Sequence, residues 1–216
     1  NLKTLDIRDN SQHRHAVPYM PLLKRFWAAH CVLTDLSFIS RATTLKTLCL
    51  VYNDISTVEP ISSLVNLSEL YLINNNITDI NHLSTLVNLR ELSLERNHIV
   101  NIDAVSTMTK LQSLDLTRNA VVDISPLSSL IELDVIRLEY NQVADIGPLS
   151  QLTKLIILDL INNQLADIGP LSQLTKLTLL YLNNNQLVDI RAVSSLTNLE
   201  ELYLSKNRIV DISPIS

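Results

Sequence analysis

The residues of this chain that could do chemistry are mainly aspartates separated by multiples of 22 residues. They are Asp79, Asp123, Asp145, Asp167, Asp189 and Asp211. Repeated carboxylates could bind calcium, but calcium takes six to eight oxygen ligands, and each repeat supplies one carboxylate at this position. Because each aspartate opens a turn-forming segment, as in Asp123–Leu127, we expect it to cap that turn. The serine before Pro126 could act as a cap as well.

The histidines and glycines carry no recognisable catalytic or metal-binding pattern. His13, His15 and His30 could bind zinc, but their spacing matches no standard zinc motif and no Cys-x-x-Cys accompanies them. The five histidines suggest no Ser–His–Asp arrangement, and the two glycines, Gly147 and Gly169, form no phosphate-binding loop. We therefore expect no enzymatic activity, no catalytic residue, no metal site and no cofactor.

A strict asparagine period shows which elements must position any functional side chain. The asparagines recur every 22 residues at Asn53, Asn75, Asn97, Asn119, Asn141, Asn163, Asn185 and Asn207. The most regular copies, Leu67–Ile77 and Leu199–Ile209, have the frame Leu-x-x-Leu-x-Leu-x-x-Asn-x-Ile. This frame is typical of a leucine-rich repeat. A side-chain amide both donates and accepts hydrogen bonds, so we expect these asparagines to satisfy buried backbone groups as a stacked ladder.

The predicted fold class is α/β, a leucine-rich-repeat solenoid of about ten repeats. A curved parallel sheet would line the concave side, and short 3-10 or irregular turns the convex side. Counting from the first leucine of the frame, positions three to seven should form each strand. We expect one domain, 1–216, with two degenerate repeats in 1–44 and eight regular repeats in 45–216, the last one cut short. Since both ends fall within a repeat, we expect a longer protein.

Composition excludes several classes of partner. The formal net charge of −5 is spread along the chain, without the basic patch that nucleic-acid binding requires. No apolar run approaches the ~20 residues of a membrane-spanning helix. Cys31 takes the place of a ladder asparagine and should point inward, whereas Cys49 should point outward from a strand. The two thiols are therefore not expected to form a disulfide.

The concave face carries the candidate partner-binding residues, because side chains at alternate strand positions face outward. The candidates are the aromatic residues Trp27, Tyr71, Tyr140, Tyr181 and Tyr203, the apolar residues Val135, Ile157 and Leu179, and the charged residues Glu91, Glu95 and Arg137. Aromatic residues and arginine anchor many protein interfaces, and contiguous apolar surface often marks one. Two plainer interpretations stay open: branched residues favour strands in any case, and charges keep a long sheet soluble.

The repeat resembles that of the bacterial internalins, in which the stretch Asp-Ile-Ser-Pro-Leu is typical. Asp123–Leu127 has this sequence, and Asp145–Leu149 and Asp167–Leu171 differ from it only by glycine for serine. The resemblance implies a non-catalytic protein–protein interaction module that grips a protein partner on its concave face. It favours a surface-exposed or secreted location, while a cytoplasmic one stays open.

An alternative hypothesis is an intracellular regulatory or scaffolding subunit. The leucine-rich regulatory subunit of protein phosphatase 1 is similar in repeat length, but it usually has Ile-Glu where this chain has Ile-Ser-Pro or Ile-Gly-Pro. Such a subunit would bind through the charged middle of the wall, around Glu91 and Glu95. The identity of the partner and the oligomeric state do not follow from the sequence.

Overall fold

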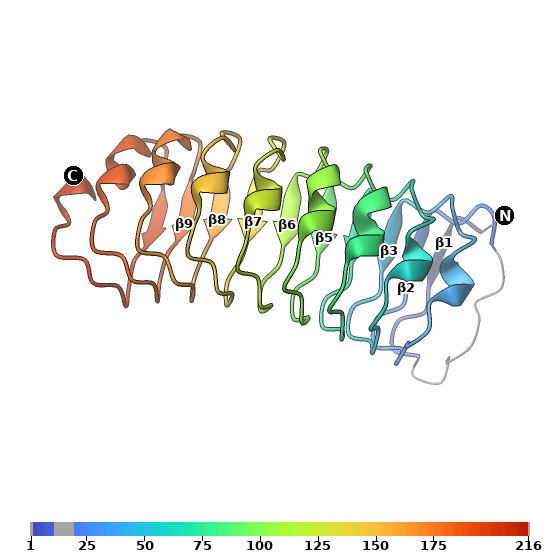
Figure 1. The fold of residues 1–216 in the computed structure, drawn as a ribbon. Coiled ribbons are helices and arrows are strands. Elements are labelled where there is room, and N and C mark those ends of the chain that lie inside the picture. The colour runs from blue at the N-terminus through green and yellow to red at the C-terminus, as the bar shows by residue number, and fades with distance from the viewer. Residues whose placement is uncertain (1, 11–19, 216) are drawn as a thin grey trace.

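The turns of the chain stack in a single row from the N-terminus to the C-terminus (Figure 1). The structure, a computed structural model, describes residues 2–10 and 20–215. Strands lie along one face of the row, and short 3-10 helices lie along the opposite face. The predicted class, a leucine-rich-repeat solenoid of about ten repeats with a parallel sheet and short 3-10 turns, is confirmed.

Ten parallel strands form one sheet in sequence order within the described residues. They are β1 (Thr4–Asp6), β2 (Arg25–Trp27), β3 (Thr47–Cys49), β4 (Glu69–Tyr71), β5 (Glu91–Ser93), β6 (Ser113–Asp115), β7 (Val135–Arg137), β8 (Ile157–Asp159), β9 (Leu179–Tyr181) and β10 (Glu201–Tyr203). Each strand covers positions three to five of its repeat and is shorter than predicted. Backbone pairing nevertheless continues, since the Leu72 and Asn74 N–H groups donate across to the next turn at 2.8 Å each.

The convex side is built from short 3-10 helices, each of which turns the chain back toward the sheet. They are η1 (Ser37–Ile39), η2 (Glu59–Ile61), η3 (Asn81–Thr85), η4 (Asp103–Thr107), η5 (Ser125–Leu127), η6 (Gly147–Leu149), η7 (Gly169–Gln173), η8 (Arg191–Ser195) and η9 (Ser213–Ile215). Each repeat of 22 residues leaves no room for a longer helix beside its strand. The short helices let neighbouring turns stack closely.

The repeated aspartates hold the start of these helices, as the sequence predicts. Asp123 Oδ1 accepts the Ser125 N–H at 2.8 Å, and Asp145 Oδ1 accepts the Gly147 N–H at 2.7 Å. The expected serine cap is wrong: Ser125 is the donor, through its N–H and its hydroxyl. Both hydrogen bonds favour the charged carboxylate, so they lower the pKa of Asp123.

The ladder asparagines join each turn to the one before it. Asn75 Oδ1 accepts the Ile55 N–H at 3.0 Å, and Asn75 Nδ2 donates to the Leu50 carbonyl at 3.0 Å. The same amide also donates to the Leu72 carbonyl of its own turn at 3.0 Å. Equivalent contacts recur at 22-residue steps, for example at Asn163. One side chain thus satisfies backbone groups that have left the strand and lie out of reach of water.

A continuous aliphatic core runs through the whole row of turns. Repeat positions four and six point inward. Their leucines, such as Leu48, Leu50, Leu70 and Leu72, have no exposed surface. Each fully buried leucine contributes roughly 1.5–3 kcal/mol. Because a turn buries its leucines only against its neighbours, stability builds up by stacking.

The second turn departs from this pattern at the place where cysteine replaces the ladder asparagine. Cys31 Sγ donates to the Ile7 carbonyl at 3.1 Å, which is the role of an asparagine amide elsewhere. The thiol lacks the side-chain oxygen with which an asparagine accepts a hydrogen bond. The backbone after Cys31 also differs from that of the regular turns. Val32 has a φ of 54°, a left-handed conformation that β-branched residues rarely adopt. Both cysteines are free, Cys31 buried and Cys49 half-buried.

We expect the ladder asparagine and its exposed neighbour to differ sharply in their contribution to stability. Asn75→Ala removes these three amide contacts and leaves one buried N–H and two buried carbonyls without that partner. It should lower the free energy of unfolding by about 2–4 kcal/mol. Asn76→Ala changes an exposed side chain and should stay within ~0.5 kcal/mol. Urea unfolding of both variants measures this, and equal effects would contradict the ladder role.

Replacing Val32 with a residue that tolerates the left-handed region should stabilise the protein. Val32→Asn relieves a strain of about 1 kcal/mol, since asparagine reaches a φ of 54° more readily than valine. The control is Val65→Asn, because Val65 is similarly exposed (44% against 39%) and has no left-handed backbone. Thermal unfolding should show a higher midpoint for the first variant only. A lower midpoint for Val32→Asn would contradict the strain.

Candidate functional site

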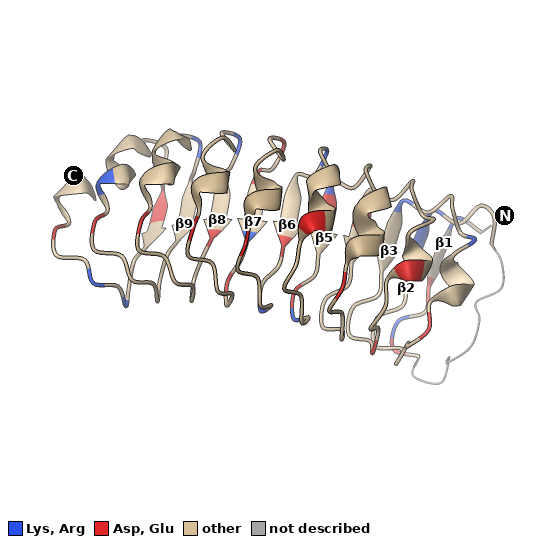
Figure 2. Cartoon of the chain, in the orientation of Figure 1, with Lys and Arg blue, Asp and Glu red and all other residues tan. Residues whose placement is uncertain are grey.

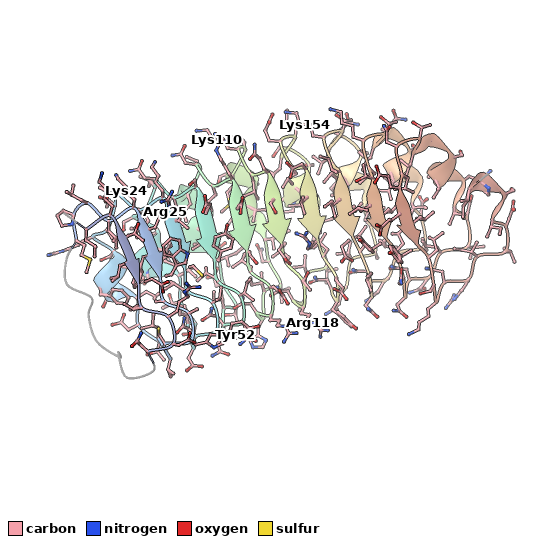
Figure 3. The ribbon with its side chains drawn as sticks, turned by 180° about the vertical axis from the view of Figure 1, so that it is seen from behind. Lys24, Arg25, Tyr52, Lys110, Arg118 and Lys154 are labelled. Atoms are coloured by element: carbon pink, nitrogen blue, oxygen red, sulfur yellow. The ribbon has the colours of Figure 1, made fainter. Side chains whose placement is uncertain are left out.

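The sheet arranges its outward side chains in rows that run along the solenoid. Strand register pairs residues 22 apart, so Glu69 lies beside Glu91 and Tyr71 lies beside Ser93. On β4, Leu70 lies between Glu69 and Tyr71 in sequence, and its side chain points into the core. Figure 3 views the molecule from the strand side with its side chains drawn. Positions three and five of successive turns therefore form two adjacent rows on one wall.

The aromatic part of the wall lies at its C-terminal end. The rings of Tyr181 and Tyr203 stack with centroids 4.8 Å apart and planes 14° apart. Tyr203 is 43% exposed, while Tyr181 is half-buried. Tyr203 Oη donates to Glu201 Oε2 at 2.9 Å, and this hydrogen bond raises the pKa of Tyr203. The stack presents a broad apolar surface with a polar tip.

An apolar row lies alongside the row that contains this stack. Val135, Ile157 and Leu179 pair directly in the register of β7, β8 and β9, and all three are half-buried. Paired strands lie about 4.8 Å apart, so their side chains touch along the row. Ile156 adds a side chain that is 42% exposed. Sequence analysis named Val135, Ile157 and Leu179, and the register brings these three together in the row next to that of Tyr181.

The middle of the wall is charged. Tyr71 Oη donates to Glu91 Oε2, and burial together with this hydrogen bond raises the pKa of Tyr71. Glu95 pairs with Arg96 at 3.1 Å, close to the edge of the sheet. Arg137 lies in register between Asp115 and Asp159. Burial raises the pKa of Asp159, against the opposing effects of the Ile161 N–H and Arg137.

Two other predicted aromatic residues lie outside the tyrosine stack, Trp27 in row five of the same wall and Tyr140 at its edge. Trp27 is half-buried on β2, in register with Cys49. Tyr140 comes three residues after the end of β7 and is 42% exposed, with a φ of 52°. It belongs to a row of left-handed residues at the edge where the strands end, and the Arg118 guanidinium lies 4.1 Å from its ring centroid. Figure 3 labels Tyr52 and Arg118 at this edge.

Two serines in the middle of the wall were missed as candidates by the sequence analysis. Ser93 and Ser113 are short side chains in the outward rows of β5 and β6. They border a hollow of about 240 Å³ together with Tyr71 and Arg137. The available signal was their small size between bulky residues in the same rows.

The described residues contain few features of other site classes. In residues 2–10 and 20–215, no three or more His, Cys, Asp or Glu side chains gather as a metal site would need. His13 and His15 lie outside the described residues. Over the same ranges no helix is long and apolar enough to span a membrane. Figure 2 shows acidic and basic residues dispersed along the solenoid.

The family comparison defines the class of protein. The family model described as leucine-rich repeats (2 copies) matches residues 43–85, 87–129, 131–173 and 175–216. The chain belongs to the leucine-rich-repeat family, whose members are typically non-catalytic protein-interaction modules. No curated protein sequence matches the chain.

Solved structures identify the branch of this family. An internalin (inlF) from Listeria monocytogenes is 30% identical, with a TM-score of 0.81 over 99% of this chain and 70% of that one. Internalin C2 from the same organism is also 30% identical, with a TM-score of 0.83 over 85% and 81%. The chain is an internalin-like leucine-rich-repeat protein. A Leptospira interrogans leucine-rich-repeat protein, 24% identical over 100% of this chain and 69% of that one, shares the fold with a TM-score of 0.73.

The hydroxyl geometry at the aromatic stack predicts a specific titration behaviour. Ionised Glu201 accepts a hydrogen bond from the Tyr203 hydroxyl, and its negative charge opposes formation of the phenolate. Glu201→Gln should therefore lower the pKa of Tyr203 toward its usual value of about 10. Carbon-13 NMR of labelled tyrosine rings measures the change against pH. The neighbouring variant Glu200→Gln should leave the pKa where it was, and an unchanged pKa in Glu201→Gln would contradict the contact.

Proposed function

We propose that the chain binds a protein partner on the concave face, through the apolar and aromatic surface over β7 to β10. The core of this surface consists of Ile157, Leu179, Tyr181 and Tyr203. The observation that carries the proposal is the stacked pair of tyrosines in row five, which lies alongside the row-three aliphatic side chains Ile157 and Leu179. A solenoid does not need large rings on this face, because its leucines already fill the core.

Physical properties of the surface favour protein recognition. Aromatic rings bury much area at little loss of side-chain entropy, and interface cores are enriched in Tyr. Contiguous apolar patches on soluble proteins mark interaction sites. A curved row of parallel strands also offers an extended wall, which suits the large surface of a protein. Two internalins are structurally similar over most of this chain, which supports the same use of the fold.

The experiment compares partner capture by the wild type and a triple variant. Tyr181→Ser, Tyr203→Ser and Ile157→Ser together remove the centre of the surface while leaving the inward leucines unchanged. Captured proteins are identified by mass spectrometry, and the affinity of the purified partner is then measured by calorimetry. We expect binding to weaken more than about tenfold.

A matched control keeps the comparison specific. Val100→Ser, Val122→Ser and Val188→Ser also replace three exposed apolar side chains (57%, 52% and 50% exposed), all outside the strands. This control should retain full affinity, and circular dichroism of both triple variants should match the wild type. A partner that binds the folded concave-face variant as tightly as the wild type would overturn the proposal.

A further inference from the structure

A hollow lies in the middle of the concave wall, next to the surface proposed above. It spans β4 to β7 and holds about 240 Å³. Tyr71 on β4 and Arg137 on β7 line it from the two outer strands, and Glu91, Ser93, Ser113 and Asp115 line it from the two strands between them. Sites for small molecules usually measure ~300–1,000 Å³. The hollow is therefore suited to a single side chain of a larger partner.

One of the lining residues has a polar atom without a partner in the described part of the chain. Ser93 is 8% exposed, and its Oγ forms no hydrogen bond among the described residues. A buried hydroxyl without a partner is costly, and the great majority of such groups in proteins are satisfied. A hydroxyl can accept a hydrogen bond from a cationic donor or donate one to an anion. The charge around the hollow decides whether a cationic donor or an anionic acceptor is favoured.

The charge around the hollow is mainly negative. From β4 to β8, row three reads Glu69, Glu91, Ser113, Val135, Ile157, and row five reads Tyr71, Ser93, Asp115, Arg137, Asp159. Arg137 is the cation of these rows, and it lies between the carboxylates of Asp115 and Asp159. The ring face of Tyr71 would also attract a cation.

We propose that this hollow receives a basic side chain of the protein partner, whose cationic group donates to Ser93 Oγ and is neutralised by Glu91 and Asp115. The inference rests on the proposed function in one respect, namely that a protein occupies the concave wall. It adds the chemistry of the partner: a segment with a lysine or arginine that faces the acidic middle while apolar residues cover β7 to β10. Charge complementarity of this kind selects one partner over others.

The test uses a probe that needs no knowledge of the partner. Nitrogen-15-labelled protein is titrated with N-acetyl-arginine amide and, separately, with N-acetyl-glutamate amide, and the backbone amides of Ser93 and Ser113 are followed by NMR. The arginine probe should shift these amides with an affinity in the millimolar range. Added salt should weaken the effect. Equal shifts with the glutamate probe, or no shifts at these amides with the arginine probe, would overturn the inference.

Variants distinguish the contribution of the carboxylates to probe binding from that of the Ser93 hydroxyl. The double variant Glu91→Gln with Asp115→Asn keeps the side-chain acceptors that bond to Tyr71 and to the Thr117 N–H. It should nevertheless lower the affinity for the arginine probe by roughly tenfold. Ser93→Ala should lower the affinity for the arginine probe by less, because the acceptor that is lost is neutral. Glu59→Gln removes an exposed carboxylate on the convex helix η2 and is the matched control. Unchanged probe affinity in the double variant would also overturn the inference.

The result of the probe titration does not depend on the result of the partner-capture experiment. The probe reports on the hollow alone, whereas partner capture depends on Tyr181, Tyr203 and Ile157. A probe that binds as expected supports the basic-side-chain site even where the aromatic variant keeps its partner. A probe that fails leaves the capture experiment to decide the role of the apolar surface.

Discussion

The fold depends on one interaction, the side-chain amide that ties each turn to the turn before it. At the end of the strands the backbone leaves the sheet inside a core of buried aliphatic side chains. Asn75 closes this gap by accepting the Ile55 N–H and donating to the Leu50 and Leu72 carbonyls. Without such an amide, each turn would bury polar groups at a cost of ~1–3 kcal/mol apiece. Repeated at every turn, the contact also sets the spacing that brings the strands into register.

This constraint leaves the outward strand positions free to vary. The inward leucines and the asparagine amides hold the turns, so residues such as Tyr71 and Ser93 occupy equivalent positions without disturbing the core. The wall consequently divides into an apolar and aromatic end over β7 to β10 and an acidic middle over β4 to β8. Both regions can face one partner, since they share a single continuous sheet. Under the two proposals, recognition would combine burial of rings with neutralisation of charge.

The second turn shows what happens when the constraint is relaxed. With Cys31 in the ladder, a thiol donates to Ile7, and Asn53 Oδ1 accepts both the Cys31 and the Leu33 N–H groups at 3.1 and 3.0 Å. The backbone reaches this arrangement by placing Val32 in the left-handed region. The Leu33 contact is the ordinary one of the ladder, and the Cys31 contact is an additional one that Asn53 makes across the same interface.

The sequence by itself determined the solenoid, its repeat length, the alternation of inward and outward residues and the role of the aspartates. These follow from contacts within one repeat, which the spacing of side-chain types records directly. Only the tertiary structure decided that the strands span three residues, that Ser125 donates to Asp123, and that Tyr140 lies at the strand-end edge. It also decided that Tyr181 stacks on Tyr203 and that Ser93 lies unpartnered in a hollow. These features depend on side-chain directions in neighbouring turns, 22 residues apart, and a linear pattern does not record such directions.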